Sequence, residues 1–124
     1  MMEFKGFPVR MRFTPIPNAV FSSLLPQMED ITELKVLLYF FEIIYPKKGS
    51  LRYVSCGELM DCAGLVSGIK GPVRETLQKA LESLTARGAL LHLPVNKGGA
   101  QEDIYFLNTE ANRQALEKVR RGEI

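Results

Sequence analysis

Five polar side chains in the second half of the sequence have the chemistry to contact DNA. Arginine and glutamine suit the hydrogen-bonding edges of purines, whereas lysine suits phosphate groups. Four of the five stand near the start of a predicted helix, Pro72–Arg87, and the fifth stands in a glycine-rich turn, Asn96–Gln101. The pattern indicates a surface formed by one helix and the tip of one hairpin. The candidate DNA-binding residues are Lys70, Arg74, Gln78, Lys79 and Lys97.

Two carboxylates and the overall charge weaken this interpretation. Glu75 and Glu82 lie in the middle of the same outward helix face, where each would meet phosphates unless it accepted a hydrogen bond from a cytosine amino group. The net charge is only +2, from 16 Lys and Arg against 14 Asp and Glu, and proteins that wrap DNA are usually more basic. Such a mixed face is also typical of a solvated helix surface or a protein contact. The turn around Lys97 is equally typical of a mobile hairpin loop.

The sequence offers no pattern that indicates catalysis. The one histidine, His92, stands between Leu91 and Leu93 on a predicted strand, and no cluster of Cys and His has the spacing of a metal site. The glycines Gly64, Gly68 and Gly71 are better explained as turn positions between two helices than as a phosphate cradle. We therefore predict a protein that is not an enzyme, with no catalytic residue, no cofactor and no metal.

The two cysteines indicate a reducing environment. Cys56 and Cys62 are predicted to lie on one helix and to point in different directions, so we expect no disulfide between them. Unpaired thiols and the lack of a secretory leader favour a cytoplasmic protein. The longest apolar run, Val36–Tyr45, is interrupted only by Glu42 and is far shorter than the roughly 20 residues of a membrane span. We expect it to be a central core helix covered on all sides, and we expect no membrane contact.

Hydrophobic spacing defines the elements that must position these groups. Their order is strand, helix, helix, strand, helix, helix, strand, strand, helix. The predicted segments are a strand at Val9–Phe13, helices at Asn18–Leu25 and Glu33–Tyr45, a strand at Leu51–Val54, helices from the cap Ser55 to about Ala63 and at Pro72–Arg87, strands at Ala89–Val95 and Glu102–Leu107, and a helix at Glu110–Arg121.

Caps and helix breakers set the bounds of these elements. Asp30 or Thr32 is expected to cap the second helix, and Glu33 has capping-box spacing from Asp30. Ser55 and Glu58 form a second predicted capping box. Pro26 is expected to end the first helix, and Pro72 is expected at the first position of the helix that ends at Gly88 in a left-handed conformation. Pro94 indicates that its strand lies at the edge of the sheet, and Asn108 or Thr109 is expected to cap the last helix.

A short helix followed by a longer helix that runs directly into a two-stranded ribbon is the order of a winged helix-turn-helix domain. We predict an α+β, mainly helical fold with an extra N-terminal strand and helix and a C-terminal helix. One winged-helix domain would span residues 1–124. It would consist of an N-terminal extension at 1–30, a core at 31–108 and the C-terminal helix at 109–124.

The start of the chain carries an unusual amount of apolar surface for a small domain. Its apolar residues at positions 9, 11 and 13 alternate with Arg10 and Arg12, and this alternation is typical of a strand with one buried face. A dimer interface would bury this surface, and folding back onto the same domain would bury it equally well. The candidate self-association residues are Phe7, Val9, Met11 and Phe13, with Phe4 close by.

Two short motifs stand in the first part of the chain, Ile16-Pro17-Asn18 and Glu33-Leu34-Lys35-Val36. Together they resemble the N-terminal domain of the DnaD family of bacterial replication-initiation and primosome proteins. That family has an "IPN" opening, a short helix, and an "ELKV" start of a hydrophobic helix before a winged helix. The resemblance implies a role in helicase loading at origins or restart sites, with self-association and contacts to replication proteins. In that family a separate C-terminal domain carries much of the DNA affinity, and the resemblance covers only the N-terminal domain.

Three function hypotheses follow. The first is a non-enzymatic winged-helix module of a DnaD-like DNA replication initiation protein, which acts by self-association and partner contact and binds DNA weakly to moderately. The second is a dimeric winged-helix transcription regulator that reads DNA through Pro72–Arg87 and the hairpin. The third is a protein-interaction adaptor without DNA binding. The expected partners are DNA, a second copy of the chain, and replication proteins.

Overall fold

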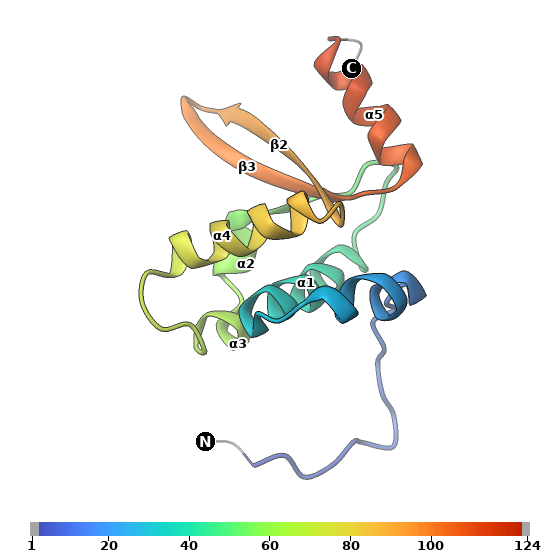
Figure 1. Ribbon diagram of the computed structural model, residues 1–124, viewed down its shortest axis with the longest axis vertical. Helices are drawn as coiled ribbons and strands as arrows, with labels where there is room; N and C mark the ends of the chain where they lie inside the picture. The colour runs from blue at the N-terminus through green and yellow to red at the C-terminus, as the bar shows by residue number, and fades with distance from the viewer. Residues whose placement is uncertain (1–2, 123–124) are drawn as a thin grey trace.

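The structure, a computed structural model, describes residues 3–122, apart from the side chain of Lys97 (Figure 1). The fold is α+β, about 49% helical, with one three-stranded antiparallel sheet. In chain order the elements are η1 (Val20–Leu24), η2 (Leu25–Gln27), α1 (Ile31–Ile44), β1 (Val54–Ser55), α2 (Cys56–Met60), α3 (Ala63–Val66), α4 (Val73–Ala86), β2 (Leu90–Lys97), β3 (Ala100–Leu107) and α5 (Glu110–Arg120).

Helix α1 lies at the centre of the core and packs against α4. Asp30 is its cap, because the Asp30 carboxylate accepts a hydrogen bond of 2.9 Å from the backbone N–H of Thr32. Val36 and Phe40 are fully buried, which confirms the predicted core helix. The expectation that α1 is covered on all sides is wrong, since Leu38 is 41% exposed.

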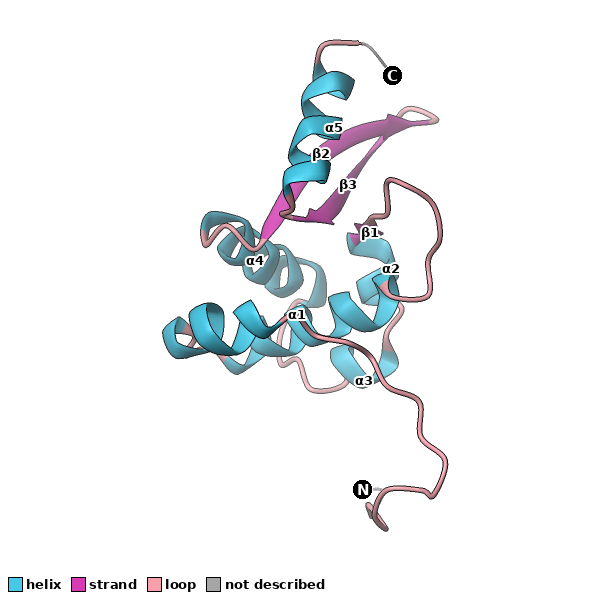
Figure 2. Ribbon diagram, turned by 90° about the vertical axis from the view of Figure 1, so that its right-hand side faces the viewer, coloured by secondary structure: helices cyan, strands magenta, loops and turns pink. Residues whose placement is uncertain are grey.

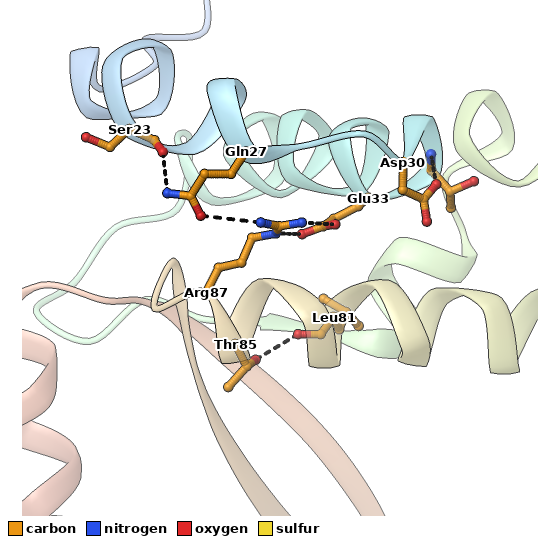
Figure 3. Close-up of polar contacts among 8 residues, drawn as sticks. Ser23, Gln27, Asp30, Glu33, Leu81, Thr85 and Arg87 are labelled. Carbon is orange, nitrogen blue, oxygen red and sulfur yellow. Dashed lines mark hydrogen bonds and ion pairs between the residues drawn. The ribbon is translucent and has the colours of Figure 1, made fainter.

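An ion pair connects the start of α1 to the end of α4. Glu33 does not complete the capping box with Asp30. The buried Glu33 carboxylate instead forms an ion pair with the guanidinium of Arg87 (Figure 3). Arg87 also donates to Gln27, at the end of η2. The result is a polar link from the end of α4 to η2 and α1, which lie more than 50 residues earlier in the sequence.

The predicted helix from Ser55 to Ala63 is two short helices. The capping box between Ser55 and Glu58 is confirmed and opens α2, which ends at Met60. Cys62 lies at the cap of α3, so the two cysteines are not on one helix, and both are free thiols. Gly64 lies inside α3 and is therefore not a turn residue. The Tyr39 hydroxyl lies so close to Gly64 that a Cβ at this position would overlap it. Gly71, with φ of +93°, does serve as a turn.

Strands β2 and β3 form a hairpin whose two faces differ. The sheet order β1-β3-β2 puts β2 at the edge and confirms the placement of Pro94. The hairpin closes in two residues, Gly98 and Gly99, both at positive φ, so the strands extend beyond the predicted bounds. One face, with Ile104 and Phe106, packs on Leu116 of α5. The other face carries His92, Asp103 and Tyr105 toward α4.

The predicted strand at Val9–Phe13 is wrong. Residues 3–17 form neither helix nor strand. Ile16 packs on the core, whereas the chain before residue 14 extends away from the domain on the side of α1 opposite the hairpin (Figures 1 and 2). A strand needs a partner for its backbone hydrogen bonds, and no neighbouring segment of the described chain lies beside it. The helix predicted at Asn18–Leu25 continues past Leu25, and Pro26 lies inside η2 instead of ending the helix.

Several bounds differ from the prediction by one or a few residues. Pro72 is the cap of α4 and not its first residue, β1 is shorter and later than expected, and Thr109 caps α5. Gly88, at φ of +86°, ends α4 as predicted.

Among the described residues no helix is long and apolar enough to cross a membrane.

Candidate functional site

The outer side of α4 is divided into a basic and an acidic part. Three of the predicted DNA contacts, Lys70, Arg74 and Lys79, are exposed at or near the start of the helix. Within residues 3–122 none of the three forms an ion pair. Glu75 is exposed beside them, as the sequence predicts. These cations are therefore free to meet an external anion, with one carboxylate in their midst.

Gln78 belongs to a different surface from the three cations. It is half-buried and lines a half-open cleft of about 470 Å³ between α4 and the hairpin, which we call the α4–hairpin cleft. The cleft is lined by Gln78, Glu82, Thr85 and Ala86 of α4 and by His92, Asp103 and Tyr105 of the hairpin. The structure thus places Gln78 in a cleft with two carboxylates, whereas Lys70, Arg74 and Lys79 do not line that cleft.

The hairpin wall of the cleft is a stacked and hydrogen-bonded unit. The His92 ring stacks on the Tyr105 ring with 4.9 Å between centroids, and its Nε2 lies 2.8 Å from Asp103 Oδ1. Burial, together with the charges of Asp103, Cys56 and Glu82, raises the pKa of Tyr105 to about 12. The Tyr105 hydroxyl therefore keeps its proton at neutral pH. The wall presents oxygen acceptors and negative charge.

The sequence contains a signal for this cleft that was missed. Taken strand by strand, His92 is only a polar residue between Leu91 and Leu93. In a hairpin the side chains two apart share one face, and His92 stands directly opposite Tyr105 in the register. Asp103 precedes Tyr105 by two residues and falls on the same face. The alternation of both strands therefore predicts a polar face with His92, Asp103 and Tyr105 together.

Most other cations of the body are engaged in contacts within the domain. Lys47 pairs with Glu58 at 2.7 Å. Although burial by itself raises the pKa of Glu58, hydrogen bonds from Lys47 and Ser55 outweigh it and lower the pKa. Arg120 donates to the backbone carbonyl of His92. The backbone of Lys97 ends β2, and its side chain lies outside the described part of the structure.

The described residues contain no group of three or more His, Cys, Asp or Glu side chains that is arranged to hold a metal ion. The two thiols are poor nucleophiles in this setting. Burial raises the pKa of Cys56 more than the nearby charge of Arg74 lowers it, and burial also raises the pKa of Cys62. Both thiols therefore stay protonated at neutral pH.

The N-terminal segment, residues 3–13, is a second candidate surface. All four candidate self-association residues are exposed, with Phe7 at 80% and Val9 at 102%. The segment also carries Lys5, Arg10 and Arg12 against one carboxylate, Glu3. Because the chain has 16 cationic and 14 acidic side chains, this leaves 13 of each for residues 14–124. The whole net positive charge of the protein therefore resides in this segment.

Comparisons of the chain with protein-family models, with curated proteins and with solved structures returned no match.

Proposed function

We propose that the chain is a winged helix-turn-helix module whose main activity is self-association through its N-terminal segment. The element order supports the winged-helix assignment, because α1, β1, α2, α4 and the β2–β3 hairpin occur in the order of that motif, with the short helix α3 between α2 and α4. The sheet order β1-β3-β2 adds support, because the hairpin pairs with the short strand before α2. The hairpin also extends beyond α4, as a wing would (Figure 2).

The observation that carries the proposal is the exposure of large apolar side chains at residues 4–13. Phe4, Phe7, Val9, Met11 and Phe13 are all exposed, and none of them reaches the core. Isolated exposed apolar residues are ordinary, but a contiguous set marks a surface that another molecule covers. A second copy of the chain would cover it and would supply the partner strand that the backbone of this segment lacks.

The resemblance to the DnaD N-terminal domain points to the same activity. It supports a module of a replication-initiation or primosome protein that works by self-association and by contact with replication proteins, with no catalytic step of its own. The polar link from α4 to η2 supports such a scaffold role, because it fixes the helices from which the segment emerges.

Sedimentation velocity of the full chain over a wide concentration range tests this proposal. We expect a concentration-dependent dimer or larger species. Phe7→Ser and Val9→Ser together are expected to shift the chain to monomer while the fold is retained, because neither side chain contacts the core. Phe21→Ser is the matched control, since Phe21 is 57% exposed and lies outside the segment. A chain that stays monomeric at every concentration contradicts the proposal.

DNA binding is the second candidate function, and the cations at the start of α4 favour it. Lys70, Arg74 and Lys79 are exposed and lack ion-pair partners in the described part of the chain. The electrically neutral body and the carboxylates Glu75 and Glu82 limit the affinity, because phosphate neutralisation supplies most non-specific binding. We therefore propose weak to moderate DNA binding that accompanies self-association.

A further inference from the structure

The α4–hairpin cleft has features of a binding site that the proposed function does not use. Its walls bring together the carboxylates of Glu82 and Asp103, the amide of Gln78 and the Tyr105 hydroxyl. Glu82 forms no ion pair within residues 3–122. A cleft of about 470 Å³ that opens to solvent is large enough for a long side chain.

Tyr105 gives independent evidence that a polar partner belongs in this cleft. The side chain is only 4% exposed, yet its hydroxyl makes no hydrogen bond to any described residue. No fully buried side-chain nitrogen or oxygen in the described part of the structure lacks a partner, so this hydroxyl is not sealed in the core. It opens into the cleft that Tyr105 lines. A nearly buried hydroxyl without a partner is costly unless something outside the fold satisfies it.

The chemistry of the walls selects a planar cation. The carboxylates of Glu82 and Asp103 accept hydrogen bonds, and the Tyr105 hydroxyl and the Gln78 carbonyl can accept as well. A guanidinium group offers five donors in one plane, can pair with a carboxylate through two hydrogen bonds, and stacks on aromatic rings. In the stacked pair, the His92 ring is the more exposed one. An ammonium group offers three donors and no flat face. The cleft therefore suits arginine better than lysine.

The N-terminal segment of another copy is the occupant that the charges favour. Arg10 and Arg12 are exposed, and neither has a partner among the described residues. The segment holds the net positive charge of the chain, whereas the cleft presents the unpaired carboxylate of Glu82 and the carboxylate of Asp103, which His92 already contacts through one oxygen. In both ribbon views the segment leaves the domain on the far side of α1 from the hairpin (Figures 1 and 2). It therefore points away from the cleft of its own copy.

We propose that the α4–hairpin cleft is a receptor for the guanidinium of Arg10 or Arg12 from the N-terminal segment of a second copy. The proposal rests on the proposed self-association and assigns its docking site. In this arrangement Glu82 and Asp103 pair with the incoming arginine, and the Tyr105 hydroxyl accepts a hydrogen bond from it. The apolar side chains of the segment add buried area around this contact.

Charge reversal with complementation tests the proposal on the full chain by sedimentation velocity. Glu82→Lys is expected to weaken self-association about tenfold, and the pair Arg10→Glu and Arg12→Glu is expected to do the same. A mixture of the two variants is expected to associate like the unchanged chain, because every cleft again meets a segment of opposite charge. Glu75→Lys is the matched control, since it makes the same charge change on α4 outside the cleft.

A variant that lacks only the Tyr105 hydroxyl tests the same docking site in a second way. Tyr105→Phe keeps the ring that stacks on His92 and removes only the hydroxyl, so we expect association to weaken several-fold without loss of the fold. If the unchanged chain associates but Glu82→Lys behaves like Glu75→Lys, the docking site is wrong and the proposed function stands. If the unchanged chain is monomeric throughout, both are wrong.

Discussion

Arg87 and Glu33, 54 positions apart in the sequence, form a two-point ion pair between the end of α4 and the first turn of α1. Arg87 Nε lies 2.6 Å from Glu33 Oε2, and Nη2 lies 3.4 Å from Oε1. The third guanidinium nitrogen, Nη1, donates to Gln27 Oε1, and Gln27 Nε2 in turn donates to the carbonyl of Ser23 (Figure 3). Hydrogen bonds to Glu33 raise the pKa of Arg87 further above its ordinary value.

Removal of Arg87 is expected to destabilise the fold more than removal of both partners. Arg87→Ala leaves the Glu33 carboxylate buried without a partner, and a lone buried charge costs more than no charge at all. We expect the midpoint of urea unfolding to fall clearly in Arg87→Ala and to recover in part in the double variant Arg87→Ala with Glu33→Gln. Equal midpoints for the single and the double variant would contradict this prediction, because the unpaired Glu33 carboxylate would then carry no penalty of its own.

Substitution of Gly64 is expected to conflict with Tyr39. A Cβ at position 64 would overlap the Tyr39 hydroxyl, so Gly64→Ala forces the ring to move and is expected to cost about 1–2 kcal/mol. In a Tyr39→Phe background the overlap disappears, and the better helix propensity of alanine is expected to stabilise α3 by up to about 1 kcal/mol. Chemical denaturation of the four variants measures this change of sign. Gly57→Ala, in the neighbouring helix α2, is the control.

Tyr105 is expected to make the fold sensitive to alkali. Its pKa is raised from 10.0 to about 12, so the folded state holds a proton that the unfolded chain has lost between these two values. The free energy of unfolding therefore falls as pH rises from about 10 toward 12, by up to about 2 kcal/mol. Tyr105→Phe is expected to remove this part of the pH dependence. Tyrosinate absorbance gives the pKa directly, and an ordinary value for Tyr105 would contradict the prediction.

Glu58 is expected to contribute to stability in the opposite range of pH. Its pKa is lowered from the ordinary 4.5, so the folded state favours the carboxylate. The contribution is complete above that ordinary value and is lost as pH falls through the lower folded pKa. We therefore expect Glu58→Gln to destabilise the chain at pH 7 and to have little effect near pH 2. Lys47→Met is expected to reproduce part of the loss, because Lys47 supplies one of the hydrogen bonds.

Reversal of the α4 cations is expected to weaken DNA binding. Lys70→Glu, Arg74→Glu and Lys79→Glu together should lower the affinity for duplex DNA at least about tenfold and reduce the salt dependence, because each lost phosphate contact lowers the slope by about 1. Fluorescence anisotropy at several salt concentrations measures both quantities. Lys118→Glu on α5 is the control for one charge reversal and is compared with Lys79→Glu alone, because the triple variant changes the net charge three times as much. Unchanged affinity would remove α4 from the DNA surface, and Lys97→Glu tests the hairpin tip separately.

Signals that act over a few residues predicted much of the fold. Asp30 and Ser55 are caps whose partners lie two and three residues away. Gly88 ends a helix because glycine tolerates positive φ, and Pro94 lies in an edge strand because proline lacks a backbone N–H. The order of helices and strands in the body of the domain followed from these signals and from hydrophobic periodicity. The break between α2 and α3 was missed because the apolar spacing continues across it.

Features that depend on a distant partner were not predictable in the same way. The capping-box spacing of Glu33 is correct, but its competitor, Arg87, is visible only after α1 and α4 have packed. The alternation of Val9–Phe13 predicts a strand, yet this segment has no strand beside it. The cleft required the pairing of β2 with β3 before His92 and Tyr105 could be seen together. Local patterns specify elements, and their contacts depend on the whole chain.

The uneven distribution of charge has a consequence for the colloidal behaviour of the protein. Residues 14–124 carry equal numbers of cationic and acidic side chains, so the electrophoretic mobility near neutral pH depends on three basic residues close to the N-terminus. A protease that trimmed those residues would leave a particle at its isoelectric point, where mutual repulsion is weakest and precipitation is favoured. The same short stretch that we propose to join copies of the chain therefore also keeps them dispersed.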